Sequence, residues 1–336
     1  MPYEHVHAVE KRDVEIAAVA APRCPSVGLS MTWSALQISG NAVPAVNRQA
    51  SSQQSAPLTE ITQWIVANRG LLVGAALIAL VSLTALLATR IAPYDPDAQL
   101  YEMRLAPPGS AYLLGGDALG RDVLSRLLYA GRISLLVALP STAIALVAGV
   151  AIGSAAGFYG GWVDRALMRM TDIVLVFPTF FLLILAVATF GRSLALLILV
   201  IGLTAWPTNA RVVRGQVLNL RTRDYVSAAR AAGAGDRWII WRHLVPQLIP
   251  IIVVSATIRV ANNILVESGL RFLGLGVAPP TPTWGNMVAE GADSMRQAGW
   301  TVIFPGGMIL LVVLAFNLTG EGLRDLLDPR HRQKRR

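Results

Sequence analysis

Six apolar stretches, spread over the last four-fifths of the chain, limit most strongly how it can fold. A helix needs about 20 apolar residues to cross a bilayer. Backbone groups inside lipid must pair within the segment, so these stretches predict helices. Charged residues make up only 15% of the sequence, which argues against an ordinary soluble enzyme. We expect an all-α polytopic membrane protein with six transmembrane helices, over residues 71–91, 133–158, 173–190, 194–210, 250–268 and 302–318.

The basic residues indicate which way these helices cross the membrane. The formal net charge is +9, and arginines cluster after the second, fourth and sixth stretches, which makes those segments cytoplasmic under the positive-inside rule. The segment before residue 133 is the exception, because its arginines are mixed with carboxylates. We therefore expect a multi-pass cell-membrane protein with cytoplasmic N- and C-termini. The basic balance points to the lipid bilayer as a partner and not to nucleic acid.

Composition also divides the chain into regions. Residues 1–60 lack a sustained helical period and are expected to be a disordered cytoplasmic tail, or to precede the true start, for which Met31 is one candidate. Residues 61–132 hold the first transmembrane helix and an extracytoplasmic segment. Residues 133–322 form the transmembrane core with a loop at 211–249, and 323–336 form a basic cytoplasmic tail.

Several kinds of chemistry are not expected of this sequence. Its lysines are Lys11 and Lys334, and neither follows the glycine-rich turn of a P-loop, so the chain is not expected to hydrolyse ATP itself. The four histidines lack metal-binding spacing, and Cys24 is the single cysteine. We predict no catalytic residues, no cofactor and no metal site.

Glycines recur every fourth residue in the second stretch, at Gly149, Gly153 and Gly157. Small residues at this spacing let another helix backbone approach closely. The partner helix can belong to another subunit or to the same bundle. Packing within the bundle is the favoured interpretation, because the motif is common in membrane helices.

The loop between the fourth and fifth stretches, residues 206–250, is too long for a plain connector. Its pattern predicts a short helix, a glycine turn and a second helix that protrude into the cytoplasm. Such a structure can rest on anionic lipid or serve as a docking site for a partner. Ala228, Ala229 and Gly233, followed by His243-Leu-Val-Pro246, resemble the EAA motif of ABC importer permeases. Ser227 stands where that motif has Glu, and His243 replaces an aliphatic residue.

Other motifs narrow the resemblance. LLGGDALGRDVLSRLLYAGRISL (113–135), ALMRMTDIVLVFPTF (166–180), ESGLRFLGLG (267–276) and PPTPTWGNMV (279–288) resemble the C-type subunit of the dipeptide/oligopeptide/nickel permease family. The resemblance implies a type I ABC importer permease fold with a cytoplasmic coupling helix.

The implied coupling residues are Ala228, Ala229, Gly233, Arg237 and Pro246. The implied partners are a second permease subunit in a heterodimer, two cytoplasmic ABC ATPase subunits and an extracytoplasmic substrate-binding protein. Di- or oligopeptides are the expected substrates, with nickel complexes, glutathione and opine-like solutes left open.

The fifth stretch carries a polar face that needs no family for its interpretation. Arg259, Asn262, Asn263 and Glu267 fall at i, i+3, i+4 and i+8 and share one side of a helix. They can satisfy each other through i,i+4 pairs, or they can line the translocation path or its gate. We expect the asparagines to line the path and Glu267 to set its outer end. An ion-coupled secondary transporter, a membrane enzyme and a structural assembly factor are the rival interpretations.

Overall fold

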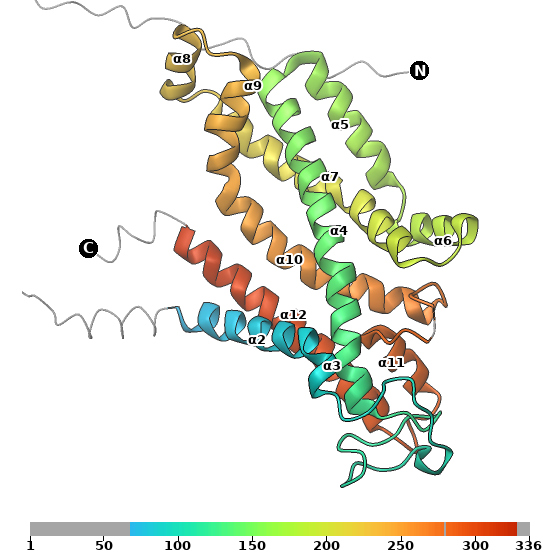
Figure 1. Ribbon diagram of the computed structural model, residues 1–336. Coiled ribbons are helices and arrows are strands. Elements are labelled where there is room, and N and C mark those ends of the chain that lie inside the picture. The colour runs from blue at the N-terminus through green and yellow to red at the C-terminus, as the bar shows by residue number, and fades with distance from the viewer. Residues whose placement is uncertain (1–67, 279, 328–336) are drawn as a thin grey trace, which may run out of the picture. The chain divides into compact units, whose positions relative to one another are not determined.

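The computed structural model describes residues 68–278 and 280–327 (Figure 1). Their regular structure is helical, apart from one isolated bridge between Gly116 and Asp122. The longer elements are α2 (Arg69–Leu86), α4 (Val123–Tyr159), α5 (Gly161–Val176), α6 (Thr179–Phe190), α7 (Leu194–Leu220), α10 (Val245–Phe272), α11 (Trp284–Ala292) and α12 (Trp300–Leu327). The predicted tail 1–60, with Met31, Lys11 and Cys24, lies outside the described residues, as does 328–336 of the predicted basic tail, with Lys334.

Five helical stretches are long and apolar enough to cross a membrane, namely α2, α4, α7, α12 and the continuous stretch Asp236–Phe272 that includes α10. Helices α5 and α6 together form a sixth candidate, bent by 78°. The expectation of six spans therefore holds when the bent pair counts as one. The expectation of one uninterrupted helix over 173–190 was wrong. Phe177 leaves helical geometry (φ −79°, ψ 123°), because the ring of Pro178 disfavours the α conformation in the preceding residue.

Helix α4 is the central element of the bundle. It contributes residues to all three buried apolar clusters and packs most extensively against α7. An added Cβ at Gly149, Gly153 or Gly157 would lie within 2.8 Å of an atom of α7. The three glycines thus serve packing within the bundle, which confirms the favoured interpretation of their spacing.

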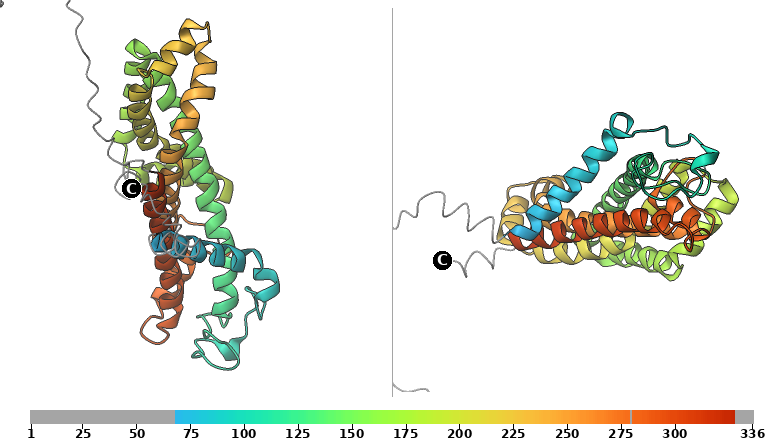
Figure 2. Two further views of the ribbon diagram at one scale, coloured as in Figure 1. Left: turned by 90° about the vertical axis from the view of Figure 1, so that its left-hand side faces the viewer. Right: turned by 90° about the horizontal axis from the view of Figure 1, so that it is seen from below.

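A second close pairing joins α2 to α12, which meet where α2 begins and diverge from there in the view from below (Figure 2). Here Gly74 meets the carbonyl of Ala315, and Gly322 of α12 meets the backbone of Leu71. Both helices share an apolar cluster with α4, α10 and α11, in which Trp284 is fully buried. This packing attaches the first span to the rest of the bundle through small residues and backbone contact.

Candidate functional site

The predicted short helix, glycine turn and second helix are present between the fourth and fifth spans. Helix α8 (Asp224–Ala231) is followed by Gly233 at φ +83°, α9 (Asp236–Ile239) and the π-helical segment η2 (Ile240–Leu244), which leads into α10. A positive φ favours glycine, since it has no Cβ to collide with the backbone. The loop's apolar side, with Val226, Ile239 and Leu244, is buried against the ends of α4 and α7. The loop is therefore a fixed part of the bundle.

The opposite side of this loop is open. Ala228, Gly233, Arg237 and Pro246 are exposed and Ala229 is half-buried, and nothing lies within 4 Å of a Cβ added at Gly233.

A hollow of about 710 Å³ adjoins this face, and Tyr225, Trp238 and His243 are among its lining residues. The rings of Trp238 and His243 meet edge to face at 4.7 Å. The buried Tyr225 hydroxyl has no hydrogen-bond partner among the described residues. The exposed face of this packed loop thus combines small side chains with a recess, a shape that suits close contact with another protein.

The polar face of α10 contacts the neighbouring helices. Asn263 is buried, and its amide donates to the hydroxyls of Ser141 and Thr142 in α4, at 3.0 Å each. Arg259 donates to the side-chain oxygen of Asn209 in α7 at 3.3 Å. Of the two interpretations left open for this face, the i,i+4 pairing of Arg259 with Asn263 is not found, because both residues bond to neighbouring helices. Asn262 is exposed on this helix, so of the two asparagines it is the one with an open face.

Glu267 occupies a different environment. It is 1% exposed, and neither carboxylate oxygen has a hydrogen bond among the described residues. The Thr283 hydroxyl interacts with this carboxyl group, and Arg271 acts on it electrostatically from one helical turn further along α10. An unpaired carboxylate in a buried site is costly. Glu267 is thus buried with Thr283 and Arg271 as its polar neighbours.

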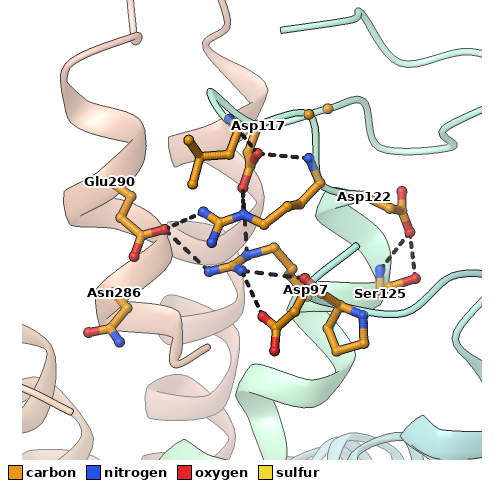
Figure 3. A network of polar contacts seen from close by, with 12 residues as sticks. Asp97, Asp117, Asp122, Ser125, Asn286 and Glu290 are labelled. Atoms are coloured by element: carbon orange, nitrogen blue, oxygen red, sulfur yellow. Dashed lines mark hydrogen bonds and ion pairs between the residues drawn. The ribbon is translucent and has the colours of Figure 1, made fainter. Parts of the chain in front are cut away.

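An ionic network joins the segment before α4 to α11 (Figure 3). Arg121 contacts Asp117 at 2.6 Å and Glu290 at 2.8 Å. Arg126 contacts the same Glu290 oxygen at 3.2 Å, and lies 3.7 Å from Asp117 and 3.6 Å from Asp97. Both arginine side chains are less than a tenth exposed, at 7% and 2%. Their charges are therefore balanced by carboxylates, which explains the mixed charge in this segment.

A third arginine completes the network. Arg271, at the end of α10, contacts the other Glu290 oxygen at 3.4 Å. A cleft of about 240 Å³ opens beside Glu290 and is also lined by Asp117, Arg121 and Asp293. None of the coupling or path residues predicted from the sequence belongs to the Asp117–Arg121–Arg126–Glu290 set. The signal available in the sequence was the excess of paired opposite charges between two apolar stretches.

Helix α5 is held by ion pairs on the side that faces α7. Arg214 makes a two-pronged contact with Asp164, at 2.5 and 2.6 Å, and Arg211 reaches Asp172 at 2.6 Å. Two parallel bonds fix orientation as well as distance. The first half of the bent pair therefore stays attached to α7, and the bend at Pro178 sets the direction of α6.

These features define a class of membrane protein. The sequence matches a family described as the binding-protein-dependent transport system inner membrane component over residues 149–333, and the chain belongs to this family. Residues 61–108 match the N-terminal transmembrane domain of oligopeptide transport permease C. The chain is thus a permease subunit of an ABC importer and a multi-pass inner-membrane protein. Permeases of this kind work with other permease, ATPase and substrate-binding proteins.

Individual relatives are similar over most of the chain. A di/tripeptide transport system permease protein of Pseudomonas aeruginosa is 41% identical over 280 residues, which cover 82% of this chain and 92% of the relative. A dipeptide transport system permease protein of Haemophilus influenzae is 39% identical over 283 residues, covering 82% and 96%. A glutathione transport system permease protein of Pectobacterium atrosepticum is 41% identical over 244 residues, covering 72% and 81%.

Proposed function

We propose that this chain is the non-catalytic subunit that forms half of the translocation path for di- or oligopeptides and receives its drive from a separate ATPase. The observation that carries the proposal is the firmly seated α8–α9 loop with its open face, found in a chain of this permease family. The names of the relatives support peptides as substrates. Glutathione is the second candidate, because one similar permease is named for it.

The proposed assembly has four kinds of component. A second permease of the family would complete the path as a heterodimer, two ABC ATPases would bind beneath the membrane, and a substrate-binding protein would dock on the other side. The α8–α9 loop faces the cytoplasm in this arrangement, together with both termini, and the network around Glu290 faces outward. The arginine-rich segments support this orientation under the positive-inside rule.

Coupling follows from how the loop is built into the bundle. When the ATPases close on ATP, they move the α8–α9 loops, and the helices attached to these loops rock so that access switches sides. The differential contact needed for such a shift is a few kcal/mol. Ala228, Ala229, Gly233, Arg237 and Pro246 supply the docking face in this proposal. Asn262, with Arg259 and Glu267 on the same helix, supplies the path or its gate, and Asn263 supports that face from behind.

Substitution of Gly233 tests the docking face. Gly233→Trp adds bulk where the structure has open space, and should abolish co-purification of the ATPase or substrate-stimulated ATP turnover. The positive φ of Gly233 strains most replacements, so Gly233→Asn is the matched control, because asparagine tolerates this conformation. We expect the control to keep both properties. Unchanged coupling in Gly233→Trp would place the docking face elsewhere.

The substrate is best identified through the binding protein. Mass spectrometry of the ligand that co-purifies with the cognate binding protein should find short peptides. If glutathione, an opine-like compound or a nickel complex were found instead, that compound would be assigned as the substrate. Uptake in proteoliposomes should require ATP when ion gradients are collapsed, and uptake driven by an ion gradient alone would favour a secondary transporter instead.

A further inference from the structure

Arg271 lies between two carboxylates on different elements. It contacts Glu290 of α11 at 3.4 Å. Glu267, four residues earlier on its own helix, is buried, and its carboxylate oxygens accept no hydrogen bond from the described residues. Side chains at i and i+4 of a helix are neighbours, and a glutamate that precedes an arginine is the favourable order. Arg271 is therefore ion-paired with Glu290 and has Glu267 as a second carboxylate within its reach.

The three arginines around Glu290 are not equivalent. Arg121 and Arg126 share one Glu290 oxygen and are also close to Asp117, so both keep a carboxylate if Glu290 moves. Arg271 has Glu290 as its only ion-pair partner in the described part of the chain, at the longest of the three distances. The Arg271 contact is thus the one that can separate while the rest of the network stays intact.

We infer that Arg271 alternates between two ion-pair partners during transport, Glu290 in one state and Glu267 in the other. Both glutamates act by positioning Arg271. With Arg271 on Glu290, the end of α10 is held against α11 and the outer entrance is closed. With Arg271 on Glu267, the ion pair between α10 and α11 is broken and the buried carboxylate gains a direct ion pair. The exchange creates no unpaired charge at Arg271 and leaves Arg121 and Arg126 on Asp117. This inference rests on the proposed orientation, in which Glu290 faces outward.

The exchange links the outer entrance to the docking loop. Asp236–Phe272 is a continuous helical stretch of 37 residues that starts in that loop and ends one residue after Arg271. A movement of α8 and α9 is therefore carried directly to the Arg271 contact. A two-state element that both ends can bias is what coupling between distant sites requires.

Opposite effects of two substitutions test the inference in the reconstituted complex. Glu290→Gln weakens the closed arrangement, and should raise ATP turnover without binding protein at least about fivefold, the low end of typical coupling factors. Glu267→Gln weakens the open arrangement, and should lower stimulated turnover by about the same factor without raising basal turnover. Glu102→Gln is the matched control, because Glu102 is exposed with no ion pair among the described residues, and it should change neither. Changes in the same direction, or no change, would overturn the inference.

A reversible cross-link gives a second measurement that does not depend on those variants. Arg271→Cys and Glu290→Cys are combined in a Cys24→Ser background and joined by a bis-methanethiosulfonate linker. The joined complex should stop uptake and recover when the linker is reduced, and the two single-cysteine proteins treated alike should not respond. If the joined complex takes up substrate as fast as the same complex after the linker has been cleaved, this contact need not open.

The orientation is tested separately at Asp293→Cys, an exposed position beside the same cleft. A membrane-impermeant thiol reagent added outside should label it in spheroplasts. Labelling only in inverted vesicles would refute the proposed orientation. External labelling combined with unaffected uptake in the cross-linked complex would refute the exchange alone.

Discussion

Replacing Gly153 with alanine should destabilise the bundle at its most extensive helix pair. An added Cβ would lie 2.5 Å from the Ala210 carbonyl oxygen and 2.8 Å from the Val213 Cβ. Ordinary contact begins at 3.4 Å, so α4 and α7 must separate locally by up to 3.4 − 2.5 = 0.9 Å. Overpacking of this kind costs about 1–3 kcal/mol. The gain in helix propensity from glycine to alanine offsets about 0.5–1 kcal/mol, which leaves a net loss between about 0 and 2.5 kcal/mol.

Gly215→Ala is the matched control, because Gly215 lies within α7 and nothing is within 4 Å of its added Cβ. Only the propensity gain applies there, so this variant should be as stable as the parent or more stable by about 0.5–1 kcal/mol. The assay is unfolding of the purified protein in mixed micelles of increasing SDS fraction, followed by tryptophan fluorescence. A Gly153→Ala protein as stable as Gly215→Ala would refute the packing account of the glycine repeat.

Three further predictions concern polar residues. Asn262→Leu should reduce ATP-dependent uptake roughly 2- to 13-fold, the factor that corresponds to losing a hydrogen bond worth about 0.5–1.5 kcal/mol, because it removes the exposed amide of the proposed path. Full uptake in Asn262→Leu would remove this residue from the path. The free energy of unfolding of Asn263→Leu should lie within about 1 kcal/mol of that of the parent, because the hydroxyls of Ser141 and Thr142 still donate to carbonyls of their own helix. Asp122→Ala should cost about 1 kcal/mol in the same unfolding assay, because the carboxylate accepts from the Ser125 backbone N–H at 2.8 Å at the start of α4. Asp122→Asn, which can still cap, should recover most of that loss, and equal stability of Ala and Asn would contradict the capping role.

The sequence predicts the spans well because lipid imposes a strong and local rule. Each predicted stretch corresponds to a described helix or helix pair, although the helices run beyond the apolar residues at several ends. The bend at Pro178 was harder to foresee. Pro140, Pro207, Pro250 and Pro305 all lie inside helices that continue through them. A proline in an apolar stretch therefore does not reveal whether the helix breaks, because neighbouring helices can satisfy the backbone groups that it frees.

The ionic network was beyond the sequence for a different reason. Glu290 follows Arg121 by 169 residues and Arg126 by 164, and no local period connects them. The polar face of α10 was predicted as a face, but the partners of Asn263 come from α4 at a separation of more than 120 residues. Side-chain partners across such distances depend on which helices pack together. That choice is made by small-residue contacts such as those of Gly149, which the sequence shows without naming the partner helix.

The length of the fifth span has a mechanical consequence. At 1.5 Å per residue, the 37 residues of Asp236–Phe272 extend over about 55 Å, whereas the hydrocarbon layer is about 30 Å thick. The surplus of about 25 Å carries the helical stretch beyond the lipid. One end lies in the docking loop, which includes α9, and the other end brings Arg271 to α11. Asn263 and Arg259 hold this helix laterally, through hydrogen bonds to α4 and α7. In the proposed mechanism these interhelical hydrogen bonds mark where α10 pivots, so that a movement at the docking loop reaches the Arg271 end of the helix.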